Sequence, residues 1–154
     1  MEKSTKGEIA ENYFKQGYNC CQAVILVFAE ETGLNKSDLL KAASSFGGGI
    51  GRLREVCGTV SAMAMAAGLI FGTDELSQEK KAAHYELIQK LAGEFKEKNG
   101  SIICRELLGL PESEKITSVP EPRTEQYYVK RPCSFYCKTA AEILEKYISE
   151  NKKE

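Results

Sequence analysis

Six cysteines are the residues of this sequence with the clearest chemical potential. Thiolates bind iron and zinc, act as nucleophiles, and cycle between thiol and disulfide. A free cysteine can also serve as a small buried apolar residue, so its place in the chain must decide between these roles. The six stand at Cys20, Cys21, Cys57, Cys104, Cys133 and Cys137.

Three of these cysteines, Cys20, Cys57 and Cys133, lie at or near the predicted start of a helix. The helix dipole and the free backbone N–H groups there favour the thiolate, which is the form that binds metal. Arg52 and Arg54 come shortly before Cys57, and they either support a thiolate or are solvated surface charges. With their support, the sequence predicts that Cys57 has the most acidic thiol of the metal-free protein.

The spacing of the other cysteines restricts what they can do together. Cys133 and Cys137 are four residues apart on one predicted helix, so they share a face. Their Cβ atoms are then about 6 Å apart, which suits two ligands of one metal better than a relaxed disulfide. Cys20 and Cys21 point about 100° apart around a helix, so only one of them is expected to face any given site.

The cysteines belong to a series of blocks along the chain. In order, these are Gly17-Tyr18-Asn19-Cys20 with Gln22-Ala23-Val24, Phe46-Gly47-Gly48-Gly49-Ile50-Gly51 with Cys57-Gly58, Cys104-Arg105-Glu106-Leu107-Leu108-Gly109, and Cys137 with Ala140-Ala141-Glu142-Ile143-Leu144. This series resembles the C_GCAxxG_C_C family of redox-active cysteine proteins, which has a related domain in split-Soret cytochromes. The sequence departs from the family motif at Thr59, where alanine is usual, and at Ala62, where glycine is usual.

The resemblance implies that four hallmark cysteines hold an iron–sulfur cluster, with zinc as the alternative metal. These four are Cys20, Cys57, Cys104 and Cys137. It leaves Cys21 and Cys133 outside the site, although Cys133 shares a helix face with Cys137 and has the chemistry to replace it. We therefore expect a protein of electron transfer or redox sensing that works with a redox partner protein.

Two other functions remain open on the sequence. A thiol–disulfide oxidoreductase would use one cysteine pair, but the Cys-x-x-Cys motif of many such enzymes is missing. A structural zinc protein would have the ligands, but a chain of 154 residues can bury enough core to fold without metal.

Other catalytic constellations are disfavoured. The single histidine, His84, falls on the apolar side of a predicted helix, where a packed residue is expected rather than a ligand or a base. A Ser/His/Asp set cannot be argued from it. The glycines between Phe46 and Arg52 lack the Lys-Ser/Thr ending and the preceding strand of a phosphate-binding loop, so they predict a turn with positive φ that leads into a helix.

Helices must position these cysteines, because apolar residues recur at helical spacing and no strand pattern is convincing. We predict an all-α, single-domain bundle over residues 1–154, of about five to six helices, with a long irregular loop at Pro111–Arg131 before the C-terminal helix. Within that loop, Gln126–Val129 is a candidate extended piece. The main helices are predicted at Ser4–Gln16, Cys20–Thr32, Val56–Phe71, Glu75–Asn99 and Pro132–Ile148, with short helical pieces at Ser37–Ser44 and Ser101–Leu108.

Composition argues against several other classes. The 21 basic and 22 acidic residues give a net charge of −1, without the clustered Lys and Arg that nucleic-acid binding needs. Val56–Thr73 holds no charged residue, but its glycines and alanines make it weakly apolar, so we expect a buried helix rather than a membrane span. The charged first residues have no apolar stretch behind them, so we expect no secretory signal and a cytoplasmic protein with reduced thiols.

Overall fold

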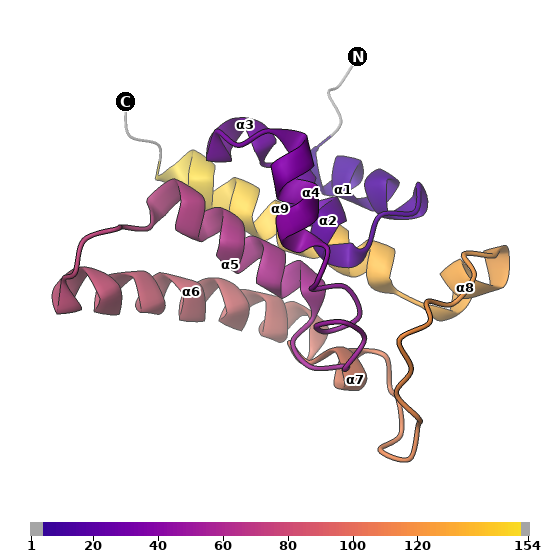
Figure 1. The fold of residues 1–154 in the computed structure, drawn as a ribbon. Helices are drawn as coiled ribbons and strands as arrows, with labels where there is room; N and C mark the ends of the chain where they lie inside the picture. Colours follow the sequence, from indigo (N-terminus) through magenta and orange to yellow (C-terminus); the bar gives the residue numbers. More distant parts are fainter. Residues whose placement is uncertain (1–4, 152–154) are drawn as a thin grey trace.

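The computed structural model describes residues 5–151, where helices form all of the regular structure apart from one isolated β-bridge (Figure 1). The all-α prediction is confirmed, but nine helices occur in this range and the predicted five to six is wrong. In order they are α1 Lys6–Lys15, α2 Cys20–Leu26, α3 Ala29–Thr32, α4 Lys36–Ala43, α5 Gly58–Phe71, α6 Gln78–Asn99, α7 Cys104–Leu107, α8 Glu125–Lys130 and α9 Cys133–Glu150.

The five main helices and two short helical pieces of the prediction correspond to seven of the nine helices, and two differences add the other two. The predicted helix Cys20–Thr32 is divided into α2 and α3, because the amides of Val27 and Phe28 bond to carbonyls three residues back and tighten the end of α2. The second difference is α8, which lies in the stretch predicted to be irregular. Thr124 caps α8 by accepting a hydrogen bond of 3.2 Å from the Tyr127 amide, so residues 126–129 are helical rather than extended.

Polar side chains cap several helices as their sequence suggests. Thr5 caps α1, Asn19 caps α2 and Ser77 caps α6, each by accepting a hydrogen bond from a backbone amide of the first turn. Ser4, the predicted start of the first helix, lies outside the described residues, as do residues 152–154.

The helices α2 and α9 lie at the centre of the bundle. α2 contacts α1, α4, α5 and α9, while α9 also contacts α1, α5 and α6. Six of the seven residues of α2 are buried, as expected for a helix that is apolar almost all round. The largest fully buried side chains of the core include Phe14, Phe28, Phe95, Ile25 and Leu39.

The uncharged stretch of the sequence forms α5, and the residues it buries are mostly small. Ala62, Ala66 and Ala67 are fully buried, which lets α5 pack closely on α2, α6 and α9. Among residues 5–151, no helix is both long enough and apolar enough to cross a membrane. The prediction that this stretch forms a buried helix is confirmed by the burial of these alanines.

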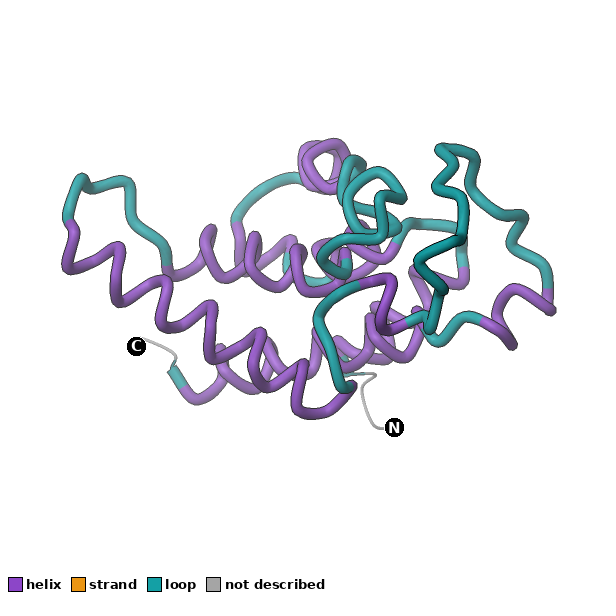
Figure 2. Tube along the Cα trace, turned by 90° about the horizontal axis from the view of Figure 1, so that it is seen from below, coloured by secondary structure: helices purple, strands orange, loops and turns teal. Residues whose placement is uncertain are grey.

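The loops and the short helices α7 and α8 gather at one end of the bundle, opposite the connection between α5 and α6 (Figures 1 and 2). Two of these loops lie close to the cysteines. We call residues 46–54 the glycine loop and residues 110–124, between α7 and α8, the cover segment.

Candidate functional site

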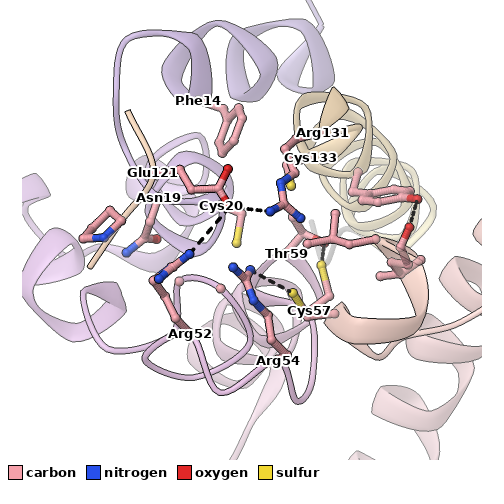
Figure 3. A pocket seen from close by; sticks show the side chains of 18 of the residues that line it. Phe14, Asn19, Cys20, Arg52, Arg54, Cys57, Thr59, Glu121, Arg131 and Cys133 are labelled. Atoms are coloured by element: carbon pink, nitrogen blue, oxygen red, sulfur yellow. Dashed lines mark hydrogen bonds and ion pairs between the residues drawn. The ribbon is translucent and has the colours of Figure 1, made fainter. Parts of the chain in front are cut away.

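A cavity of about 380 Å³ lies at the end of the bundle where the loops gather. Four thiols line it, and they come from four separate segments of the chain: Cys20, Cys57, Cys104 and Cys133. Figure 3 shows Cys20 near the middle of this cavity, and Cys57 and Cys133 lie to the right of Cys20 in this view. Three of the four predicted site cysteines are therefore brought together, and the fourth position at the cavity is occupied by Cys133.

Helix starts position three of these thiols. Cys20 and Cys133 are the first residues of α2 and α9, and Cys57 is the N-terminal cap residue of α5. Because all three line one cavity, the N-terminal ends of three helices converge there. The predicted placement of these cysteines at helix starts is confirmed.

A short backbone pairing holds Cys104 beside Cys57. Val56 and Ile103 form an antiparallel β-bridge. The Cys57 amide donates to the Ile102 carbonyl at 2.7 Å, and the Cys104 amide donates to the Glu55 carbonyl at 2.6 Å. Two cysteines that are 47 positions apart in the sequence are thus joined by main-chain hydrogen bonds.

The glycines near the cysteines are required by the close approach of the thiol side chains. A Cβ on Gly58 would lie 2.5 Å from the Cys20 sulfur and 2.7 Å from the Phe46 carbonyl oxygen. A Cβ on Gly49, which has a φ of +75°, would lie 2.8 Å from the Cβ of Cys104. The glycine loop and the start of α5 therefore form a cradle into which only glycine fits.

The glycine loop is also strained. All five residues from Gly48 to Arg52 have positive φ, and Arg54 does as well. Ile50, Arg52 and Arg54 are not glycines, and such a conformation costs about 1 kcal/mol or more for each of them. Backbone hydrogen bonds hold the loop in place, among them those from the Arg54 amide to Gly48 and from the Glu55 amide to Gly49, both 3.0 Å.

The other two cysteines lie behind the cavity. Cys21 and Cys137 are completely buried and do not line it. The Cys137 sulfur donates a weak hydrogen bond to the Cys20 carbonyl at 3.8 Å, so it sits against the backbone of α2. Cys20 lies at the centre of the group, since its charge when ionised would raise the pKa of Cys21, Cys57, Cys133 and Cys137.

Burial dominates the acidity of these thiols. It raises the pKa of Cys57 well above its ordinary value, the Cys20 charge adds to this, and a hydrogen bond with the Thr59 hydroxyl, 3.1 Å away, opposes it. The prediction that Cys57 has the most acidic thiol is therefore wrong, because burial raises its pKa further than that of Cys133 and outweighs the helix start. Burial also raises the pKa of Cys133 to about 12.

The thiol at Cys20 has donors arranged around it. Burial raises its pKa, while backbone hydrogen bonds from Gly48, Cys21 and Gly58 act in the opposite direction. Hydrogen bonds of this kind stabilise a thiolate and tune the metal group that it binds. Cys20 is thus the thiol that the backbone is best arranged to support as a thiolate.

Four guanidinium groups line the cavity together with a single carboxylate, that of Glu121. The four are Arg52, Arg54, Arg123 and Arg131. Arg54 donates to the Cys104 sulfur at 3.7 Å, so this arginine acts on a different cysteine from the one the sequence predicted. The cavity is therefore positively charged next to its thiols.

Residues 18–147 match the family described as "putative redox-active protein (C_GCAxxG_C_C)". The chain belongs to this family. The match contains all six cysteines, the glycine loop and the cover segment, so it includes nearly the whole cavity lining. No curated protein and no solved structure matches the chain.

The cover segment of this C_GCAxxG_C_C protein lines the cavity with Ser118, Pro120, Glu121 and Arg123. Arg52 donates to the carbonyls of Thr117 and Val119 and pairs with Glu121. Arg123 donates to the carbonyls of Phe14 and Tyr18, at 2.9 and 3.1 Å, and stacks 4.1 Å above the Phe14 ring. Side chains of arginine therefore fasten this irregular segment over the site.

Sequence reasoning missed Arg123, Arg131 and Glu121 as residues of the site. A signal was present: the chain has only five arginines, and four of them line this cavity. His84, by contrast, is half-buried on α6 near Gly68 of α5 and does not line the cavity, as its sequence context predicted.

The arrangement of donors can be compared with what a metal group requires. Among residues 5–151, no three His, Cys, Asp or Glu side chains come together closely enough to hold one metal ion. A tetrahedral zinc ion needs its ligands within about 2.3 Å of one point. The four thiols share the wall of a larger cavity, and thiols are the donors by which proteins hold iron–sulfur groups.

Proposed function

We propose that the cavity holds an iron–sulfur cluster and that the protein works in electron transfer or redox sensing, together with a redox partner protein. The observation that carries this proposal is the convergence of four thiols from four separate segments on one cavity. Thiolates are the usual ligands of such clusters, and four of them satisfy one cluster. When bound, the cluster would supply a site that takes up and releases single electrons.

The charge of the cavity supports an anionic occupant. Neutral thiols do nothing to balance the four guanidinium groups, and Glu121 balances only one of them. A cluster with four thiolate ligands carries about two negative charges in its oxidised form. The arginines would therefore stabilise the cluster and its thiolates, and metal binding would overcome the raised pKa values of the buried thiols.

We propose Cys20, Cys57, Cys104 and Cys133 as the ligands. The first three belong also to the set that the sequence motif implies. Cys133 is preferred for the fourth position because it lines the cavity, whereas Cys137 is completely buried behind it. The buried, free thiols fit a reducing compartment, so we propose a cytoplasmic protein.

A thiol–disulfide reaction is the second candidate, favoured by the position of Cys20 next to the other thiols. All six cysteines are free, and the Cys20 thiol interacts electrostatically with each of the other five. A disulfide with Cys20 would need only local movement, but the deep burial of these thiols slows attack by an external thiol.

The test is analysis of iron, acid-labile sulfide and zinc after anaerobic purification of the protein and of six single Cys→Ser variants. We expect iron with sulfide, lost in the variants of Cys20, Cys57, Cys104 and Cys133, and retained in C21S and C137S, which serve as buried controls. Zinc without sulfide would mean that the thiols hold a zinc ion and no cluster. Absence of all three would reject the cluster and leave the thiol–disulfide reaction. Loss in C137S with retention in C133S would give the ligand set that the motif implies.

A further inference from the structure

Arginine and lysine are distributed very differently in this protein. Of its 21 basic residues only five are arginines, and four of these line the cavity. The fifth, Arg105, follows Cys104 directly at the start of α7. In the described part of the chain no lysine lines the cavity. Positive charge alone does not explain this preference, since lysine would supply it equally well.

Arginine differs from lysine in the anions that it recognises. Its planar guanidinium group presents a fork of N–H donors that matches the two oxygens of a carboxylate, and it tolerates partial burial better than an ammonium group. Arg52 and Arg131 meet this description, because their side chains are only 15% and 13% exposed. The mouth of the cavity is thus built for an oxyanion.

One such oxyanion is already there, and it belongs to the protein. The Glu121 carboxylate pairs with Arg131 and lies 3.8 Å from Arg52 through the same oxygen, Oε1. Its side chain is 44% exposed, so it reaches the two buried guanidinium groups from the solvent side. Glu121 belongs to the irregular cover segment, which side-chain bonds to arginine fasten in place.

The positive charge at this mouth is not fully balanced. Burial lowers the pKa of Arg52, and the neighbouring charges of Arg54 and Arg131 lower it further, while Glu121 acts in the opposite direction. Even a cluster with about two negative charges, added to Glu121, would leave one guanidinium of the four without a counter-charge. A further anion at the mouth would therefore bring the cavity closer to neutral and be stabilising.

We infer that the mouth of the cavity is a binding site for a small organic carboxylate, and that Glu121 occupies the place of the ligand's carboxylate in this structure. The ligand's carboxylate binds Arg52 and Arg131. Its remainder lies against Phe14 and Tyr127, which supply aromatic walls beside the arginines. A volume of about 380 Å³ limits the ligand to a small molecule. Binding displaces Glu121, and the site does not depend on which metal group, if any, the thiols hold.

The experiment measures binding of benzoate to the iron-free, reduced protein by isothermal titration calorimetry. In the wild-type protein benzoate competes with a tethered carboxylate whose effective concentration is in the millimolar range. We therefore expect Glu121→Gln to tighten benzoate binding about tenfold or more. Glu112→Gln is the matched control, since it makes the same change at an exposed position of the cover segment that does not line the cavity. Its affinity should equal that of the wild-type protein.

Two further measurements decide the chemistry of the ligand. Benzamide, the neutral analogue, should not bind, and E121Q combined with Arg131→Gln should lose benzoate binding while keeping the helical circular dichroism of E121Q. Equal affinity of wild type and E121Q, binding of benzamide, or tighter binding of inorganic phosphate than of benzoate would each overturn the inference. Because iron content plays no part in these measurements, a failure here leaves the proposed cluster standing, and a protein without iron can still bind benzoate.

Discussion

The glycine loop and the cover segment border the same cavity, but they are held in different ways. The glycine loop is fixed by main-chain hydrogen bonds and by side chains packed directly against its glycines, Asn19 at Gly47 and Cys104 at Gly49. The cover segment is attached mainly by the side chains of Arg52, Arg123 and Arg131. Main-chain contacts restrict a loop to one shape, whereas a few side-chain contacts can be released together. Cys20 and Cys104 pack against the start of α5 and the glycine loop, which we call the rigid side of the cavity.

The largest effect is expected where the rigid side is overpacked. Gly58→Ala places a Cβ 2.5 Å from the Cys20 sulfur, so we expect the free energy of unfolding to fall by about 3 kcal/mol. Gly93→Ala is the matched control, because Gly93 lies inside α6 with nothing within 4 Å of the added Cβ, and there the free energy of unfolding should rise by about 0.5–1 kcal/mol. Urea unfolding of both variants measures this; equal effects would mean that the cradle is not tight.

This contrast also shows what the sequence can predict. The helices follow from apolar periodicity and from caps such as Asn19 and Ser77, which act over one turn. The resemblance of their blocks to the family motif implies that Cys20, Cys57 and Cys104 share one site, and these three cysteines do line one cavity. Their environment could not be read from spacing, because the burial that raises the pKa of Cys57 comes from the tertiary fold.

The fourth thiol and the arginines show a second limit. Cys133 and Cys137 share a helix, and which of them faces the cavity depends on the rotation of α9 against α2. Arg123 and Glu121 lie in a segment without apolar periodicity, so nothing local indicates which distant residues they contact. Arg123 bonds to Phe14, 109 positions away, and Glu121 pairs with Arg52. Only the concentration of arginine in a chain that otherwise uses lysine indicates their role.

The second prediction concerns the attachment of the cover segment. Arg123→Ala removes two hydrogen bonds from a guanidinium group and its stacking on Phe14, so we expect a loss of about 2 kcal/mol. This loss should be local, because the core helices do not depend on residues 110–124. Limited proteolysis should cleave the cover segment faster, by tenfold or more, while urea unfolding of the core changes little. A matched drop in global stability without faster cleavage would show that the cover segment is part of the core.

The third prediction concerns the thiol of Cys133. In the folded, iron-free protein burial raises the pKa of Cys133 to about 12, from an ordinary value of about 9. The folded state therefore keeps a proton that the unfolded state releases, so this contribution is complete below pH 9 and is lost as the pH rises toward 12. Above pH 9 the free energy of unfolding should therefore fall with pH less steeply in Cys133→Ser than in wild type. The difference between the two slopes should be up to about 1.4 kcal/mol per pH unit.

Lysine and tyrosine also titrate in this range, but they do so in both proteins. Their contribution to the free energy of unfolding therefore cancels when the variant and the wild type are compared at the same pH. Identical slopes between pH 9 and pH 10.5 would contradict the burial of this thiol. The measurement is urea unfolding at several pH values under reducing conditions, with iron removed, so that metal binding does not hold the thiolate.

The smallest effect tests the junction between the glycine loop and the helix that carries the central thiol. Asn19 caps α2 by accepting a hydrogen bond of 2.8 Å from the Gln22 amide, and it packs against Gly47 of the glycine loop. Asn35 makes the equivalent cap of 2.8 Å at α4, outside the cavity lining. Replacing either residue with alanine should cost about 1 kcal/mol of stability, since each removes one cap.

The two variants should differ in the reactivity of Cys20. If Asn19→Ala loosens the start of α2 locally, the Cys20 thiol becomes accessible more often, by about fivefold for 1 kcal/mol. Asn35→Ala weakens a helix that does not hold the thiol, so its Cys20 should react as in wild type. Alkylation rates of Cys20 in the iron-free protein, followed by mass spectrometry, separate the cases. Equal acceleration in both variants would mean that Cys20 is reached only through global unfolding, and that the rigid side of the cavity opens as one unit with the whole bundle.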